Sequence, residues 1–416
     1  MRTLEIMAPV GSFEALGAAI DAGCNSIYFG VAQLNMRTRA AHNFTLEELK
    51  EVADRCKTVG VRSYITLNVL LYEHDMTMMR KIIDTAKASG IDAIIAQDIA
   101  AIQYARQVGM SVQASTQLSI SNFESVKFYA QFADTVVLAR EVDIPMMKRI
   151  CEGIVTEQIR GPAEALVKIE VFAHGALCIA QSGRCHMSLL QNNTSAQRGA
   201  CLQECRHKYR IIDDETGKEM MVDNQYVLSP KDLCTLPFLD ELIDTGVNVL
   251  KLEGRGRSPV YVNTVVRVYR EAADAVLAGT FTSEKIDEWM RALESVYNRG
   301  FTDGYYLGRK LPEWSGEPGN RATEERVFVG NVVHYYDRIG IAEIKVQANE
   351  LRKGDKYAIM GKTTGFVQDV VAEMKLDENF VESSGKGVII TMPVPRLVHR
   401  NDSLYLLRKP VPRAFA

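Results

Sequence analysis

The chain has 416 residues, of which 47% are hydrophobic and 24% charged, and a formal net charge of −3. This composition is typical of a soluble globular protein, and the length exceeds one ordinary hydrophobic core, so we expect two domains. It excludes a generally basic nucleic-acid binder but not a local basic patch. We find no apolar run long enough for a membrane helix and no secretory leader, and we therefore expect a cytoplasmic protein without membrane contact.

The first part of the chain alternates short apolar segments with amphipathic ones. The predicted strands cover residues 4–9, 26–30, 62–71, 91–98, 110–119, 134–140, 165–175 and 247–254. The predicted helices cover residues 12–23, 45–60, 76–89, 99–109, 122–132, 144–154 and 229–246, followed by 260–278 and 284–299. Eight β-α units predict an α/β fold, a (β/α)8 TIM-like barrel. An open doubly wound sheet is the alternative, but no Gly-x-Gly-x-x-Gly follows the first strand, which disfavours its dinucleotide-binding form.

The pattern changes after the barrel. We assign residues 1–310 to the barrel domain and residues 311–326, rich in Pro, Gly and charge, to a linker. Residues 327–416 contain six short alternating segments separated by turn residues, which predict a small all-β barrel. A hairpin-like segment is expected at residues 209–224.

A cysteine-rich segment, residues 170–210, is predicted as an insertion after the seventh barrel strand. It contains Cys178, Cys185, Cys201 and Cys205, spaced C-x6-C-x15-C-x3-C. Disulfides are rare in the cytosol, and clustered thiols in polar, Gly-containing sequence indicate a metal centre. Because the C-x2-C spacing typical of zinc is missing, an iron–sulfur cluster suits the pattern at least as well.

Two other interpretations of the cysteines remain open. The thiols can be buried structural groups, as we expect for Cys24, Cys56, Cys151 and Cys234. One of the clustered thiols can also be a nucleophile, because His174 and His186 are nearby in sequence as candidate bases.

Polar residues follow the predicted barrel strands, where barrel enzymes place their working groups. We expect the following to bind substrate: Tyr28, Asn68, Gln97, Gln113, Arg140 and Arg255. We expect the following to be catalytic, without assigning acid or base: Glu170, His174, Lys251 and Glu253. Arg140 and Arg255 could clamp a carboxylate by paired hydrogen bonds. The alternative for any one of these residues is a helix cap or a salt bridge at the barrel rim.

The cysteine segment contains Glu170-x-Phe172-x-x-Gly175-Ala176-Leu177-Cys178-x4-Gly183-x-Cys185-x-x-Ser188. Other distinctive stretches are MAPVGSFEAL (7–16), LSPKDL (228–233), LKLEGRGRSPVYV (250–262) and FTDGYYLG (301–308). On these motifs the chain resembles peptidase family U32, the collagenase-like peptidases, over nearly its whole length. The resemblance implies that the four clustered cysteines are the ligands of a [4Fe-4S] cluster.

Despite its name, this family includes branches that resemble hydroxylation factors. One resembles tRNA hydroxylation proteins that form 5-hydroxyuridine at the wobble position and draw on prephenate. A second acts on a cytidine of 23S rRNA, and a third serves ubiquinone hydroxylation and lacks the C-terminal β-domain. The length and domain order here are most similar to the tRNA branch.

That branch implies the tRNA anticodon loop as partner and a prephenate-like dicarboxylate as co-substrate. A homologous partner subunit is a further implication, and we expect the basic segment 396–413 to guide the tRNA. A U32-type peptidase and an rRNA hydroxylation factor are the alternatives. Cluster ligation weakens the peptidase interpretation, because the thiols then have another role.

Overall fold

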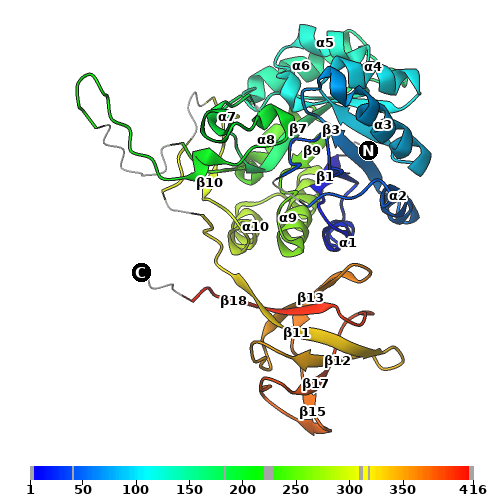
Figure 1. The fold of residues 1–416 in the computed structure, drawn as a ribbon, viewed down its shortest axis with the longest axis vertical. Helices are drawn as coiled ribbons and strands as arrows, with labels where there is room; N and C mark the ends of the chain where they lie inside the picture. The colour runs from blue at the N-terminus through cyan, green and yellow to red at the C-terminus, as the bar shows by residue number, and fades with distance from the viewer. Residues whose placement is uncertain are drawn as a thin grey trace.

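The computed structural model describes residues 4–39, 42–181, 184–219, 228–308, 313–316 and 319–411. These residues form a barrel surrounded by helices and a separate body of antiparallel strands below it (Figure 1). Within the described residues, no helix is both long and apolar enough to cross a membrane.

Eight parallel strands close the barrel. They are β1 (Glu5–Pro9), β2 (Ser26–Phe29), β3 (Arg62–Leu67), β4 (Ala93–Ala96), β5 (Ser111–Ala114), β6 (Thr135–Val137), β7 (Lys168–Ala176) and β9 (Val249–Leu252). Each of the first seven pairs with the next, and β9 pairs with both β1 and β7. The predicted (β/α)8 architecture is therefore confirmed, and the open sheet is excluded.

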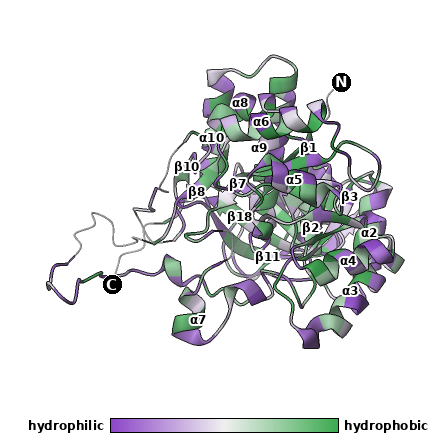
Figure 2. Ribbon diagram, turned by 90° about the horizontal axis from the view of Figure 1, so that it is seen from above, coloured by the Kyte–Doolittle hydropathy of each residue, from purple (hydrophilic) through white to green (hydrophobic). Residues whose placement is uncertain are grey.

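Helices cover the outside of the barrel. They are α1 (Phe13–Asp21), α2 (Leu49–Thr58), α3 (Met76–Ser89), α4 (Ile99–Gln107), α5 (Phe123–Ala130), α6 (Ile144–Thr156), α8 (Leu239–Asp244), α9 (Pro259–Leu277) and α10 (Ser283–Ser295). Figure 2 shows hydrophilic and hydrophobic sides on several of them, as expected for helices with one face against a core. A capping box precedes α2: Thr45 and Glu48 each donate a backbone N–H to the other's side chain, at 3.0 and 3.3 Å.

The prediction of a helix at residues 229–246 was wrong for the first half of that range. Residues Asp232–Cys234 form a short strand, β8, which pairs antiparallel with the end of β7. A 3-10 turn at Leu236–Phe238 follows, and helix begins only at Leu239. Pro237 lacks the N–H that a helix interior needs, and β7 extends past its barrel neighbours and offers a free edge. A two-residue strand, β10 (Phe301–Thr302), adds to β8.

The cysteine-rich segment is largely irregular. It contains α7 (Met187–Asn192) and 3-10 turns at Ala196–Arg198 and Glu204–Arg206. In the segment expected to resemble a hairpin, Ile212 bridges antiparallel to Glu219, and residues 220–224 lie outside the described part of the chain.

The C-terminal body is all β, as predicted. Its strands are β11 (Glu325–Tyr336), β12 (Ile341–Val346), β13 (Lys356–Gly361), β14 (Gly365–Val370), β15 (Lys375–Leu376), β16 (Asn379–Phe380), β17 (Ile389–Pro393) and β18 (Ser403–Arg408). The order is β14-β13-β18-β11-β12-β17-β15-β16, around a hydrophobic core separate from that of the barrel. Among the described residues, no ladder joins β14 to β16.

The two bodies contact each other through α1 and β14. Ala18 of α1 packs in a small apolar cluster with Met360, Phe366 and Leu407 of the sheet. Within the predicted linker, Glu313 lies against the barrel and forms an ion pair with Lys231 at 2.8 Å, and Glu325 already begins β11.

Candidate functional site

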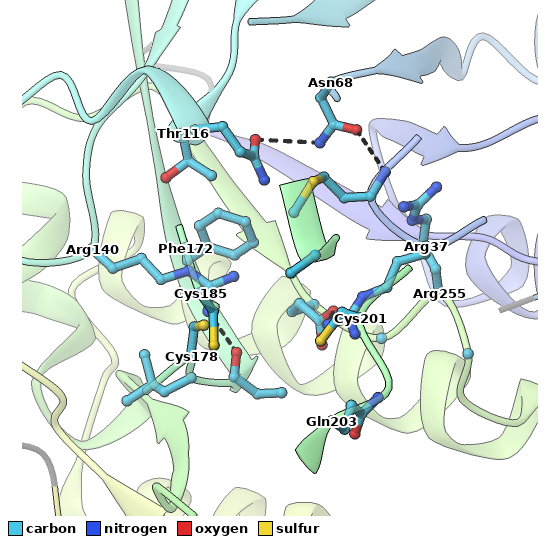
Figure 3. Close-up of a pocket in the computed structure, with 18 of the residues that line it drawn as sticks. Arg37, Asn68, Thr116, Arg140, Phe172, Cys178, Cys185, Cys201, Gln203 and Arg255 are labelled. Carbon is cyan, nitrogen blue, oxygen red and sulfur yellow. Dashed lines mark hydrogen bonds and ion pairs between the residues drawn. The ribbon is translucent and has the colours of Figure 1, made fainter. Parts of the chain in front are cut away.

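A cavity of about 210 Å³ lies at the C-terminal mouth of the barrel, under the cysteine-rich segment. Ten of the predicted site residues line it: Tyr28, Asn68, Arg140, Lys251, Glu253, Arg255, Cys178, Cys185, Cys201 and Cys205. Figure 3 shows Cys178, Cys185 and Cys201 in this cavity together with Arg140 and Arg255. Sequence positions more than 200 residues apart thus meet in one place because parallel strands end at one rim.

The four cysteines share the cavity and are partly buried. Cys205 interacts electrostatically with the other three thiols, and burial raises its pKa to about 11. Burial also raises the pKa of Cys185, which interacts with Cys178 and Cys201. These four side chains are the candidates for holding a metal centre.

The thiols are not spaced for a single ion. Within the described residues, no three His, Cys, Asp or Glu side chains lie close enough together to hold one metal ion. Zinc–sulfur bonds of about 2.3 Å would bring ligand sulfurs to within about 4.6 Å of one another. The arrangement therefore lacks the compactness of a preformed zinc site.

A buried ion pair forms the floor of the cavity. Lys251 Nζ lies 2.7 Å from Glu170 Oε1, and the two side chains are 5% and 0% exposed. Lys251 faces the cavity and lies 4.4 Å from the Tyr28 ring centre, whereas Glu170 lies deeper in the barrel. Burial lowers the pKa of Lys251 and raises that of Glu170, and their mutual attraction opposes both shifts.

The two predicted carboxylate-binding arginines keep donors available. Arg140 donates to the carbonyl of Ala176 at 2.5 Å and stacks on Phe172 at 3.9 Å, but its buried Nε has no hydrogen-bond partner among the described residues. Arg255 donates to Thr66 Oγ1 at 2.9 Å, and burial lowers its pKa to about 10. In the described part of the chain, neither guanidinium has a carboxylate at ion-pair distance.

Four further arginines line the cavity and were not predicted: Arg37, Arg206, Arg257 and Arg299. Arg37 forms an ion pair with Glu253 at 2.9 Å. Burial favours the neutral form of Glu253, but Arg37, Arg140 and Arg257 outweigh it and lower the pKa to about 2. Glu253 is therefore an ionised carboxylate at neutral pH and not a proton donor.

The remaining predicted residues do not line the cavity. His174 packs among Tyr261, Tyr269 and Phe301 outside the barrel strands, and burial lowers its pKa to about 3. This position argues against the catalytic role predicted for it. The Gln97 side-chain amide donates to the backbone carbonyl of Asn68 at 3.0 Å and so helps to orient Asn68. Gln113 is buried.

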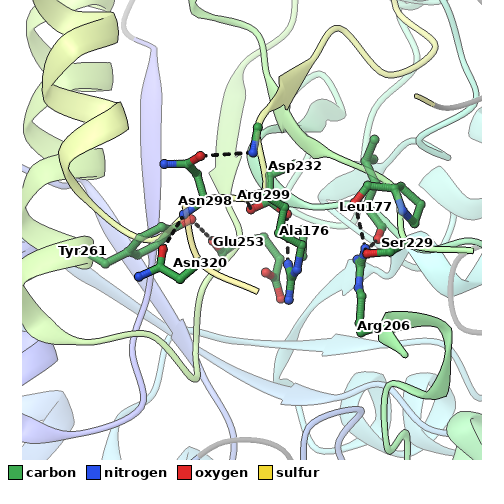
Figure 4. Close-up of polar contacts among 12 residues, drawn as sticks. Ala176, Leu177, Arg206, Ser229, Asp232, Glu253, Tyr261, Asn298, Arg299 and Asn320 are labelled. Carbon is green, nitrogen blue, oxygen red and sulfur yellow. Dashed lines mark hydrogen bonds and ion pairs between the residues drawn. The ribbon is translucent and has the colours of Figure 1, made fainter. Parts of the chain in front are cut away.

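The charge of the lining is strongly positive. Seven basic side chains and two acidic ones, Glu204 and Glu253, face the cavity. Behind this wall, Arg299 is held by Asp232 at 3.0 Å, and the Tyr261 hydroxyl donates to the carbonyl of Glu253 at 2.9 Å (Figure 4). Such a site favours an anionic ligand.

Comparison with known proteins gives the family. Residues 11–316 match the model of peptidase family U32. A protein named collagenase from Porphyromonas gingivalis is 48% identical over 405 residues, covering 97% of this chain and 98% of the relative. The tRNA hydroxylation protein P1 of Bacillus subtilis is 32% identical over 368 residues, covering 86% and 83% of the two chains. The 23S rRNA 5-hydroxycytidine C2501 synthase of Escherichia coli is 30% identical over 408 residues, covering 95% of this chain and 58% of the relative. The chain belongs to peptidase family U32.

Proposed function

We propose that the chain is an RNA-modifying enzyme that forms 5-hydroxyuridine at the wobble position of tRNA. In this proposal it holds a [4Fe-4S] cluster and uses a prephenate-like dicarboxylate. The observation that carries the proposal is one cavity lined both by four cysteines and by Arg140 and Arg255, neither of which has a carboxylate at ion-pair distance within the described residues. The relatives named for tRNA and rRNA hydroxylation support the substrate class.

The residues present fit such a cluster. The donor set is four thiols from one segment, and a cube of four irons needs its thiolates farther apart than a single ion does. Cys178, Cys185, Cys201 and Cys205 would hold it. When bound, the cluster supplies one-electron chemistry at the cavity wall.

The protein's own groups position the reactants. Arg140 and Arg255 would bind the two carboxylates of the co-substrate, since both keep guanidinium donors for it. Tyr28 and Phe172 bring aromatic rings to the cavity lining, where a splayed uracil would contact them. Lys251 presents its Nζ proton to the cavity from the Glu170 ion pair.

RNA has to reach this mouth from outside. In the basic segment, Arg396 forms an ion pair with Asp21 at 2.5 Å and Arg408 one with Glu325 at 2.9 Å. The Arg408 pair is a weak surface pair for which a phosphate can compete, whereas Arg396 also donates to the carbonyl of Phe366 and joins the two bodies. Binding through phosphates would fall steeply with rising salt concentration.

Peptidase activity is the second candidate, because the relative at 48% identity is named collagenase. A cysteine peptidase needs a thiolate beside a histidine base. Among the described residues no cavity cysteine is hydrogen-bonded to a histidine, and Cys185 Sγ instead accepts the backbone N–H of Met187 at 3.5 Å. We therefore rank this function second.

The test compares tRNA nucleosides by mass spectrometry in a deletion strain carrying the wild-type chain, Cys201→Ala or Cys24→Ala. Wobble hydroxyuridine should be absent with Cys201→Ala and present with the other two, since Cys24 is a buried thiol that does not line the cavity. Normal hydroxyuridine in the empty deletion strain contradicts the proposal. Loss confined to a 23S rRNA cytidine keeps RNA modification but overturns the tRNA assignment. Collagen cleavage by the same purified proteins tests the second candidate, and a co-purifying homologue would identify a partner subunit.

A further inference from the structure

We propose that Arg206 is a positioning residue for the cysteine set. Its guanidinium joins the backbone beside Cys205 to the backbone beside Cys178 and keeps a positive charge next to both sulfurs. The inference rests on the proposed function, because it concerns the residues that would hold the cluster.

The contacts of Arg206 are directional. Nη2 donates to the carbonyl of Leu177 at 2.6 Å, and Nη1 donates to the carbonyl of Pro230 at 2.7 Å and to Ser229 Oγ at 2.9 Å (Figure 4). Leu177 directly precedes Cys178, and Arg206 directly follows Cys205. One side chain therefore fixes the separation of two cysteine-bearing segments that are distant in sequence.

The acceptors adjoin two paired strands. Leu177 follows the end of β7, and Ser229 and Pro230 precede β8, which pairs with β7 through Ala176 and Asp232. Asp232 is buried and held by Arg299. Arg206 thus ties the turn at Glu204–Arg206 to the residues that adjoin β7 and β8 at the barrel mouth, which is how outer groups orient metal ligands.

The charge of Arg206 acts on the thiols. Arg206 lines the same cavity, has no carboxylate at ion-pair distance among the described residues, and interacts electrostatically with Cys205 and Cys178 as well as with Asp232 and Arg299. Arg210 in the same segment is different: it is exposed and held by Glu219 at 2.8 and 3.0 Å. Arg210 therefore provides a matched control.

The experiment uses the full chain purified without oxygen, as wild type, Arg206→Gln, Arg206→Lys and Arg210→Gln. Iron and acid-labile sulfide per chain, iron loss to a chelator, thermal midpoint and cluster reduction potential are measured for each. We expect Arg206→Gln to retain iron about tenfold less well. Its remaining cluster should have a lower potential, because the nearby positive charge that favours the reduced state is gone.

The other variants separate geometry from charge. Arg206→Lys keeps the charge but loses the planar fork, so its potential should stay near wild type while its iron retention falls. Arg210→Gln should match wild type in both iron retention and reduction potential. A thermal midpoint unchanged from wild type in Arg206→Gln shows that the loss is local.

The outcomes are distinguishable. Wild-type protein without iron overturns the proposed function and this inference with it. Wild-type protein with iron, beside Arg206→Gln with unchanged retention and potential, overturns this inference alone. If both Arg206 variants lose iron faster but keep the wild-type reduction potential, Arg206 contributes only to loop packing. That result also overturns the inference.

Discussion

Glu170 and Lys251 depend on each other because both side chains are almost fully buried. Replacing Glu170 by Gln leaves a buried ammonium without its counter-charge, which typically costs about 3–5 kcal/mol. The double variant Glu170→Gln/Lys251→Met should recover much of that loss, since no charge is then stranded. Unfolding in urea measures the free energies of the wild type, both single variants and the double variant.

A cost below about 1 kcal/mol in both single variants would contradict a charged pair. The proton would then be shared so that both groups are neutral, a state that burial favours for each of them.

Glu253 should make stability depend on acid pH. Its pKa in the folded chain is about 2, against an ordinary value of 4.5, so the folded state favours the ionised form. The resulting stabilisation, about 3 kcal/mol, is present above pH 4.5 and is lost as the pH falls towards 2. The difference in unfolding free energy between wild type and Glu253→Gln should shrink over this range. A difference that stays constant with pH would show that Arg37 does not stabilise the carboxylate.

Single residues were predictable where a regular strand places them. Lys251 lies in β9 and Glu253 directly follows it, two positions along, so both side chains reach the mouth. His174 was misplaced because the register of β7 shifts between Phe172 and His174, and a bulge turns the following side chain to the other face. Arg37 lies in an irregular loop whose path no periodic pattern indicates.

At the scale of elements, β7 connects the barrel to the cysteine-rich segment, because the end of β7 leads directly to Cys178. Gly175 there has φ +107°, and a Cβ would stand 2.6 Å from the carbonyl oxygen of Glu253. Gly175→Ala should therefore lower stability by more than backbone strain alone, which costs about 1–3 kcal/mol. It should also weaken iron retention, because the clash moves the strand end away from β9.

Gly217 gives the matched control for that change. It has φ +66° but open space around its Cβ position, so Gly217→Ala introduces strain without a clash. Thermal unfolding and iron content of the two variants are compared. Equal effects would show that the contact between Gly175 and Glu253 has no part in holding the two strands.

Regular helices and strands could be predicted from their own residues. The exceptions depended on contacts with neighbouring elements and could not be predicted in this way. Helices such as α6 begin at an Asp cap and a Pro, which are visible in the sequence. The strand β8 was missed because its partner is the free edge of β7, a feature that exists only once the barrel has closed.

At the scale of the whole molecule, the feature to explain is the contact between the barrel and the β-sheet body. The contact is close at one point, where Gly17 of α1 meets Gly365 at the start of β14: a Cβ on Gly17 would stand 2.6 Å from the Cα of Gly365. No sequence pattern pairs two glycines so far apart, so this junction was not predictable. The ion pair between Arg396 and Asp21 lies beside it and joins the same two bodies.

Gly17→Leu tests whether this junction couples the two bodies. Leucine favours helix over glycine by about 1 kcal/mol, so α1 itself should gain stability. The leucine side chain nevertheless has no room against backbone, and the sheet has to move away. Calorimetry should then show two unfolding transitions in place of one, and proteases should cut between the bodies sooner. Gly385→Leu, whose Cβ position in the β-sheet body is open, should keep a single transition. A single transition in Gly17→Leu as well would mean that the apolar cluster around Phe366 and the Arg396 ion pair hold the bodies together without the glycine contact.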